Sequence, residues 1–117
     1  MSIVQRPEFR DKYDNFIGGR FVPPVKGEYF DNISPIDGKV FAKAARSTKE
    51  DIELALDAAH QAFETWGKTS PAYRSGILNK IADVMEANLE YLATVEAIDN
   101  GKAIRETLAA DLPLCID

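Results

Sequence analysis

Residues 47–67 read STKEDIELALDAAHQAFETWG, and this stretch has the pattern of a helix that is apolar on one face. Apolar residues recur at intervals of four and three, whereas acidic and amide side chains occupy the opposite face. The apolar face consists of Ile52, Leu56, Ala59, Phe63 and Trp66. Two pairs have the spacing of a capping box, Ser47 with Glu50 and Thr48 with Asp51. The sequence therefore predicts an amphipathic helix that begins at one of these two caps.

A second helical pattern follows this one directly. Gly67 predicts the end of the first helix, and Ser70-Pro71 combines a capping serine with a proline at the first helical position. The apolar positions behind it are Leu78, Ala82, Met85, Leu89 and Leu92. Asn88 is compatible with the cap of a new helix and with a place inside one long helix. Asn100-Gly101 predicts a left-handed stop.

A hairpin is predicted upstream of these helices, at residues 15–22, which read NFIGGRFV. Gly18-Gly19 can supply the positive φ angles that a two-residue hairpin turn requires. In that register Phe16 faces Phe21 across the two strands, which is a favourable aromatic pair. Pro23-Pro24 ends the second strand, because proline cannot donate a hydrogen bond to the sheet.

Two further strand patterns follow the hairpin, at residues 29–33 and 39–45. A turn signal, Pro-Ile-Asp-Gly at residues 35–38, separates them. We therefore expect the first 45 residues to form short antiparallel β-structure.

The two ends of the chain have weaker patterns. Residues 1–12 are polar and include Pro7, so we expect a loosely held extension before a unit that covers 13–117. Residues 103–110 again look helical, and Pro113 leaves the end of that helix open. For the chain alone, the predicted fold class is α+β, with short antiparallel strands and a hairpin followed by amphipathic helices.

Composition excludes several classes of protein. The chain has 117 residues, 14 basic and 19 acidic, for a net charge of −5 with both signs interspersed. Because no basic stripe is present, a nucleic-acid partner is not expected. No apolar run approaches the roughly 20 residues of a membrane span, and no signal peptide is evident at the start. The single cysteine, Cys115, cannot form an internal disulfide. A soluble, cytoplasmic protein without a membrane partner fits these features.

No residue has the surroundings of a catalytic group. Cys115 lies in an apolar string, where a free thiol typically belongs to a core or an interface. His60 is the only histidine, so it has no second histidine with which to bind a metal. Gly18-Gly19 lacks the third glycine and the following helix of a phosphate-binding loop. We therefore assign no catalytic or cofactor-binding residue.

Several segments, in their order and spacing, resemble the amino-terminal region of aldehyde dehydrogenases, and most closely the bacterial acetaldehyde-type enzymes. The most specific is DNGK at residues 99–102, followed by IRET at 104–107. The turn NISPIDG resembles the family's Asn-Pro-x-x-Gly turn, with serine where many members have asparagine. The matching segments are 15–22, 32–38, 57–63 with Trp66, Arg74, 99–102, 104–107 and 110–114.

This resemblance implies a fold and an activity. The family has an α/β fold with a Rossmann-like cofactor domain, a catalytic domain and an oligomerisation arm, and residues 13–117 would form the front part of the cofactor domain. The parent enzyme would oxidise a small aldehyde to a carboxylate with NAD or NADP, as a homo-oligomer. Its glycine-rich loop, general-base glutamate and nucleophilic cysteine lie downstream, so the fragment itself would be inactive.

The resemblance also implies an alkali-metal site for K⁺ or Na⁺. Its ligands in the family are a backbone carbonyl after the second strand and the aspartate of the Asp-Asn-Gly segment. The matching positions are Ile33, with Asn32 as an alternative, and Asp99. A further ligand lies beyond Asp117, so the fragment alone would hold the ion poorly. An ordinary structural role for Asp99 at a helix end is the alternative interpretation.

Two rival interpretations do not require an enzyme. The chain could be a free-standing interaction module that binds a full-length dehydrogenase or another protein. It could also be a truncated product without activity. In either case the apolar helix faces through Phe63, Trp66, Leu78 and Met85 would be only partly covered, so we expect the isolated chain to self-associate.

Overall fold

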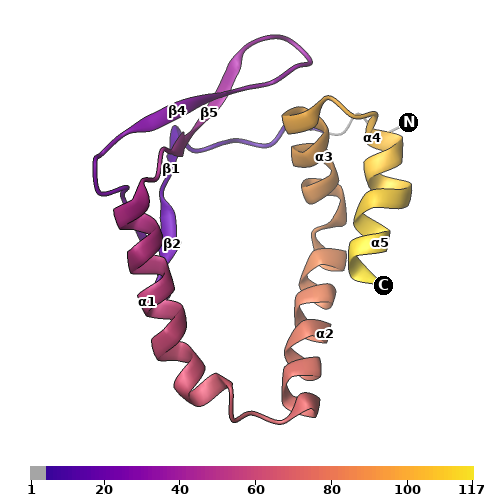
Figure 1. Cartoon of the computed structure of the whole chain (residues 1–117). Helices are drawn as coiled ribbons and strands as arrows, with labels where there is room; N and C mark the ends of the chain where they lie inside the picture. The colour runs from indigo at the N-terminus through magenta and orange to yellow at the C-terminus, as the bar shows by residue number, and fades with distance from the viewer. Residues whose placement is uncertain (1–4) are drawn as a thin grey trace. The chain divides into compact units, whose positions relative to one another are not determined.

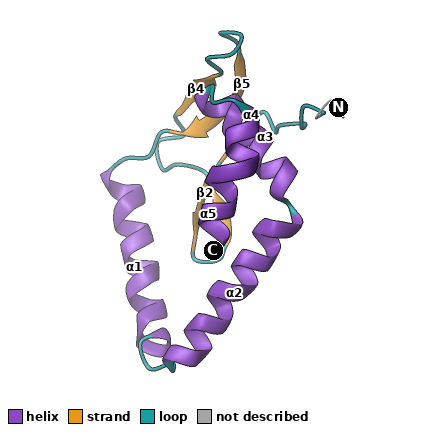
Figure 2. Cartoon of the chain, turned by 90° about the vertical axis from the view of Figure 1, so that its right-hand side faces the viewer, coloured by secondary structure: helices purple, strands orange, loops and turns teal. Residues whose placement is uncertain are grey.

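The computed structural model describes residues 5–117, which form two compact units. The strand unit contains residues 9–32 and 40–69, and the helical unit contains residues up to Glu8, 33–39 and 70–117. Both strands and helices are present, as the α+β prediction required (Figure 2). None of the helices within the described part of the chain is long and apolar enough to cross a bilayer.

The hairpin of the strand unit has the predicted register. β2 (Asn15–Ile17) pairs antiparallel with β3 (Arg20–Val22), and Phe16 lies opposite Phe21 with 5.1 Å between ring centroids. Gly18 and Gly19 have φ angles of 61° and 80°, as a two-residue hairpin turn requires. The local signals in residues 15–22 were therefore sufficient to predict this element.

The remaining strands correct the prediction of purely antiparallel β-structure. β1 (Lys12–Tyr13), β5 (Val40–Ala45) and β4 (Tyr29–Ile33) form a sheet in the order β1-β5-β4. β1 pairs with β5 in parallel, with Lys12 opposite Lys43. This pairing joins residues 31 positions apart, so no turn signal in the sequence indicates it.

Residues 6–12 are not the loose extension that their polarity suggested. The Phe9 and Phe41 rings meet edge to face at 4.9 Å, and the Lys43 N–H donates to the Asp11 carbonyl at 3.1 Å. In the helical unit, Arg6 forms an ion pair with Asp37 at 3.3 Å. The first four residues of the predicted extension lie outside the described residues.

Helix α1 (Lys49–Trp66) begins at the second of the two alternative caps. The Thr48 N–H donates to the Asp51 carboxylate at 2.8 Å, and Thr48 and Asp51 form a capping box. Gly67 caps the other end with a φ of −60°. A Cβ at Gly67 would lie 2.9 Å from the Phe63 carbonyl oxygen, so the helix end requires glycine for space rather than for a positive φ.

The apolar face predicted for α1 is exposed in this chain. Ile52 is 55% exposed and Phe63 is 67% exposed, whereas the half-buried positions are Ala55 and Ala58. α1 contacts strand β2 of the narrow hairpin, and small alanines suffice for that contact. The large apolar side chains of α1, Phe63 and Trp66 among them, therefore have little to pack against in this chain.

The helical unit contains α2 (Pro71–Ala87), α3 (Leu89–Asn100), α4 (Ile104–Glu106), the π-helical turn η1 (Thr107–Asp111) and α5 (Leu112–Ile116). Ser70 caps α2 by accepting the Tyr73 N–H at 3.1 Å, and Asn88 separates α2 from α3. Helicity continues past residue 110, with Pro113 in the first turn of α5, where a missing N–H is tolerated.

The core of the helical unit is formed by α3 and the segment from η1 to α5, which lie side by side (Figure 1). Its buried residues are Ala93, Thr94, Ala97, Ile98, Thr107 and Leu112. The Thr107 hydroxyl is fully buried and donates to the Ala93 carbonyl at 2.9 Å. Cys115 on α5 is exposed and lies outside this core, so of the two predicted locations, a core or an interface, only the interface stays a prediction.

Candidate functional site

The predicted cation ligands both belong to the helical unit. Ile33 is the last residue of β4, and Asp99 is the second-last residue of α3. Among the residues that the structure describes, no group of three or more His, Cys, Asp or Glu side chains could hold a metal ion. The site would therefore depend on backbone oxygens together with the single carboxylate of Asp99.

A buried serine connects the two predicted ligand positions. Ser34 follows Ile33, is 1% exposed, and donates its hydroxyl proton to the Ile98 carbonyl at 2.7 Å. Ile98 is the neighbour of Asp99, so this bond joins segments that are 64 residues apart in the sequence. The sequence identified Ser34 only as a departure from the family's asparagine and gave no indication of its partner.

The backbone of the turn at residues 33–39 fixes the direction of the Ile33 carbonyl. The Ser34 N–H donates to the Lys39 carbonyl at 2.9 Å, and the Gly38 N–H donates to the Ser34 carbonyl at 2.9 Å. In a trans peptide the C=O and the next N–H point in opposite directions. The Ile33 carbonyl therefore points away from Lys39, toward the edge of β4 that β5 does not occupy.

Gly101 packs against the same turn. Its φ of 78° confirms the predicted left-handed stop after α3. A Cβ at this position would lie 2.9 Å from the Pro35 Cγ atom, so glycine is required for both conformation and space. We name residues 33–35 and 98–101 the corner.

An ion pair holds the segment that follows the corner. The Lys102 ammonium donates to both Asp111 oxygens, at 2.6 and 2.8 Å. The Asp111 carboxylate raises the pKa of Lys102, because its hydrogen bond favours the charged ammonium. Since Asp111 ends the π-helical turn, the Asp-Asn-Gly-Lys segment is attached to the core of the helical unit at this end too.

The chemistry of the corner fits an alkali cation better than a transition metal. Asp99 offers a carboxylate and Ile33 a backbone carbonyl, and hard cations prefer such oxygen ligands. The Ile98 carbonyl already accepts the Ser34 hydroxyl proton. The two predicted ligands are therefore of the oxygen type that an alkali cation prefers.

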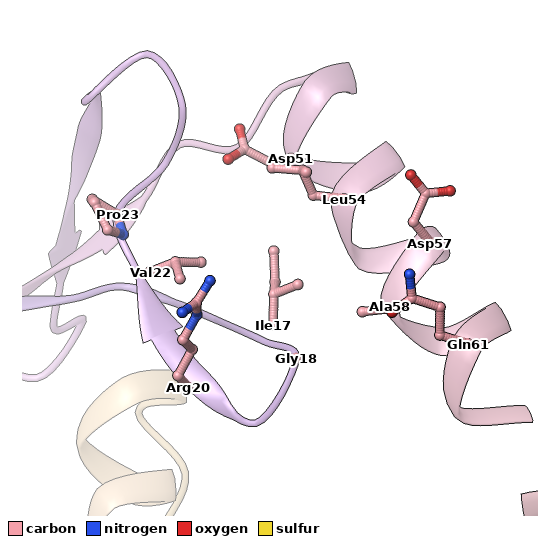
Figure 3. Close-up of a pocket in the computed structure, with 10 residues that line it drawn as sticks. All are labelled: Ile17, Gly18, Arg20, Val22, Pro23, Asp51, Leu54, Asp57, Ala58 and Gln61. Carbon is pink, nitrogen blue, oxygen red and sulfur yellow. The ribbon is translucent and has the colours of Figure 1, made fainter. Parts of the chain in front are cut away.

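The strand unit has a separate open pocket of about 470 Å³ between the hairpin and α1 (Figure 3). Side chains of Ile17, Arg20 and Val22 face Leu54 and Ala58 of α1 across it. Its lining residues contain no thiol, hydroxyl or imidazole group that could act as a nucleophile. Gly18 contributes to its wall as part of the hairpin turn, consistent with the structural role predicted for that glycine pair.

Neither chemical candidate from the sequence lies in a catalytic arrangement. Cys115 is exposed near the end of α5, and His60 is exposed on α1. They belong to different units of the chain. Within each unit, no other cysteine or histidine is present to complete a nucleophile–base pair.

Comparisons with known proteins agree in the family that they identify. The sequence pattern described as the Aldehyde dehydrogenase family matches residues 21–117. An aldehyde dehydrogenase of Deinococcus radiodurans is 71% identical over 109 residues, covering 93% of this chain and 21% of that protein. A long-chain-aldehyde dehydrogenase of Acinetobacter is 67% identical over 109 residues, covering 93% of this chain and 22% of that protein.

Solved structures share the fold of this chain. An indole-3-acetaldehyde dehydrogenase complexed with NAD⁺ has a TM-score of 0.85 and 36% identity, covering 90% of this chain and 22% of its own. The NAD⁺ complex of an aldehyde dehydrogenase from Bacillus cereus has a TM-score of 0.85 and 34% identity, with coverage of 90% and 22%. The chain thus spans about a fifth of the length of these relatives.

Proposed function

This chain belongs to the aldehyde dehydrogenase family, and we propose that it forms the amino-terminal part of an NAD(P)-dependent enzyme that oxidises an aldehyde to a carboxylate. The observation that carries this proposal is the 71% identity to an aldehyde dehydrogenase over 93% of the chain. The chain covers 21% of that relative, so the shared reaction is proposed for the whole polypeptide that contains this sequence. The substrate would be a small aldehyde.

Within the parent enzyme, residues 13–117 would form the front part of the cofactor-binding domain. The support is that similar solved structures contain this fold as 22% of a longer chain. The role of this piece would be that of a scaffold, since neither Cys115 nor His60 has a partner group that could activate it. The reacting groups of the enzyme would lie downstream.

NAD is the cofactor that the comparisons favour for the parent, because two of the similar structures contain NAD⁺. NADP remains the alternative, and the choice would be made by residues outside this chain. Homo-oligomeric assembly and a cytoplasmic location complete the proposal for the parent, on the basis of the family resemblance and the composition.

The corner would hold K⁺ or Na⁺ through the Asp99 carboxylate and the Ile33 carbonyl, with a further ligand from the downstream chain. The cation would supply positive charge between oxygen atoms that otherwise repel one another. Support comes from the oxygen-only chemistry of the corner and from the Ser34–Ile98 hydrogen bond, which ties the neighbours of both ligands together.

The proposal is tested by NADH formation from NAD and acetaldehyde, with two proteins side by side. One is the whole polypeptide that contains this sequence, and the other is the 117-residue chain. We expect turnover from the whole polypeptide and none from the chain alone. Turnover by the 117-residue chain that disappears in Cys115→Ala would contradict the scaffold role. No turnover of any aldehyde by the whole polypeptide would contradict the proposed activity.

A further inference from the structure

We propose that Asn100 is a deamidation site, and that the last turn of α3 controls the rate of this spontaneous modification. Asparagine is among the chemically labile residues of proteins. Asn100 is exposed, and it is the only asparagine of the chain that precedes a glycine. Gly101 has no Cβ to shield its backbone nitrogen, which is the atom that reacts with the Asn100 side chain. This inference is independent of the proposed activity and of the cation site.

The reaction needs only water besides these two residues. The Gly101 nitrogen loses its proton to hydroxide and attacks the Asn100 Cγ atom. A new C–N bond closes a cyclic imide, and the bond from Cγ to the side-chain nitrogen breaks, so that this nitrogen takes up a proton from water and leaves as ammonia. Water then opens the ring at either carbonyl, which gives aspartate or, with a lengthened main chain, isoaspartate.

Hydrogen bonds of the folded chain restrain both reacting groups. The Gly101 N–H donates to the Ala97 carbonyl at 2.9 Å, so the attacking nitrogen is held in the last turn of α3. The Asn100 side chain is anchored at both ends, because its NH₂ group donates to the Glu96 carboxylate at 2.6 Å and its oxygen accepts the Lys102 N–H at 2.8 Å. An amide proton of this kind is removed only when its hydrogen bond opens. The reaction therefore requires opening of the last turn of α3.

The cost of this opening sets how much the fold slows the reaction. Opening the turn breaks the hydrogen bonds of the Gly101 and Lys102 N–H groups. The net contribution of one hydrogen bond changes an opening equilibrium about two- to tenfold. We therefore expect deamidation of Asn100 to be about four- to a hundredfold slower in the folded protein than in the unfolded one.

The products of the reaction fit the end of α3 less well than Asn100 does. A carboxylate in place of the Asn100 amide cannot donate to Glu96 and repels it instead. Like charges four residues apart on a helix are unfavourable, as is negative charge at a helix C-terminus. Isoaspartate would also lengthen the main chain before Gly101, where a Cβ would already lie 2.9 Å from the Pro35 Cγ atom. Deamidation should therefore loosen the last turn of α3.

The test incubates the whole polypeptide that contains this sequence at mildly alkaline pH, folded or unfolded in guanidinium chloride. Mass spectrometry of its peptides measures the replacement of side-chain NH₂ by OH at each asparagine. Asn88 is the internal control, because it also ends a helix and has an anchored side chain, which donates to the Val84 carbonyl at 2.8 Å, but it precedes leucine. We expect Asn100 to deamidate in both samples, about four- to a hundredfold more slowly when folded, and Asn88 to stay intact over the same time.

Two substitutions test the anchor of the Asn100 side chain. Glu96→Ala releases one end of it and should raise the rate in the folded protein about twofold, the effect of an exposed side-chain pair at this spacing. Glu90→Ala is the matched control, because it removes an exposed glutamate from the first turn of the same helix, and it should leave the rate unchanged. Neither substitution should alter the rate in guanidinium chloride.

A third variant, Asn100→Asp, reproduces one product of the reaction. Hydrogen exchange of the amides in residues 97–102 should be about two- to tenfold faster in this variant than in the unaltered protein.

Each part of the inference has a result that would overturn it. An intact Asn100 in guanidinium chloride, or equal modification of Asn88, would show that the site is wrong. Equal rates in the folded and unfolded samples, or an equal rise in Glu96→Ala and Glu90→Ala, would show that the hydrogen bonds at the end of α3 do not control the reaction. Unchanged hydrogen exchange in Asn100→Asp would show that the modification does not loosen the helix.

Discussion

The Asp51 carboxylate accepts the backbone N–H of Val25 at 2.8 Å, so the residue that caps helix α1 also closes the loop after the hairpin. Its second oxygen accepts the Thr48 N–H at 2.8 Å. Asp51 is the one buried residue of α1, at 2% exposed. The hydrogen bonds from Thr48 and Val25, in that order, lower the pKa of this carboxyl below its usual value of 3.8.

This lowered pKa predicts how stability depends on pH. A carboxyl whose folded pKa is depressed stabilises the protein above its unfolded pKa, and the contribution is lost as the pH falls through the folded value. Below about pH 4, the urea concentration at the midpoint of unfolding should therefore decrease more steeply with falling pH in the unaltered chain than in Asp51→Asn. Urea unfolding at several pH values between neutral and acidic provides the measurement.

A matched control separates Asp51 from the other carboxylates that titrate in the same range. Asp57→Asn removes an exposed carboxylate from the same helix and should leave the decrease of the urea midpoint at low pH unchanged. If the urea midpoints of Asp51→Asn and Asp57→Asn depend on pH as that of the unaltered chain does, the hydrogen bonds of the Asp51 carboxylate do not contribute to stability.

Two glycines in the helical unit predict opposite effects of the same substitution. Gly101→Ala places a side chain at a φ of 78° and 2.9 Å from Pro35, which should destabilise the chain by about 1–3 kcal/mol. Gly76 lies within α2 with open space around it, so Gly76→Ala should stabilise by up to about 1 kcal/mol. Urea midpoints measure both. A neutral Gly101→Ala would show that the corner is not packed as described.

The parts of the fold that sequence could predict are those with local causes. The hairpin depends on Gly18-Gly19 and on an aromatic pair five residues apart, and α2 depends on Ser70-Pro71. The parallel pairing of Lys12 with Lys43 is non-local, so neither segment carries a signal for it. The two candidate caps of α1 were equivalent by spacing, and the contact of Asp51 with the distant Val25 is specific to the second.

The ligands proposed for the candidate site stay a prediction, and the geometry around them could not be predicted from the sequence. Ile33 and Asp99 followed from the resemblance of two short segments to a family pattern. The hydrogen bond from Ser34 to Ile98 joins those two segments across the fold. The sequence does not indicate it, because nothing in the sequence distinguishes a buried serine from an exposed one. The apolar neighbours of Cys115 favour a core or an interface, and the core alternative does not hold in this chain because Leu114 and Cys115 are both exposed.

The exposed apolar side chains predict self-association of the isolated chain. Phe63 in the strand unit and Leu78 in the helical unit are each about two-thirds exposed, and patches of several hundred Å² typically bind partners. Sedimentation should show association that increases with concentration. Phe63→Glu should reduce it, whereas Gln61→Glu, which adds the same charge nearby on α1, should not. A compact monomer at all concentrations that binds no hydrophobic dye would show the prediction to be wrong.

The central claim is that this sequence is the amino-terminal part of a longer dehydrogenase, and the intact mass of the protein made in its own cells tests it most directly. The chain has a mass of 13.0 kDa and covers 21–22% of the relatives described above. We therefore predict a mass about four to five times larger, and a reading frame that continues past Asp117 into a glycine-rich loop and a cysteine motif. An intact mass of 13.0 kDa, with a stop codon after Asp117, would contradict the account.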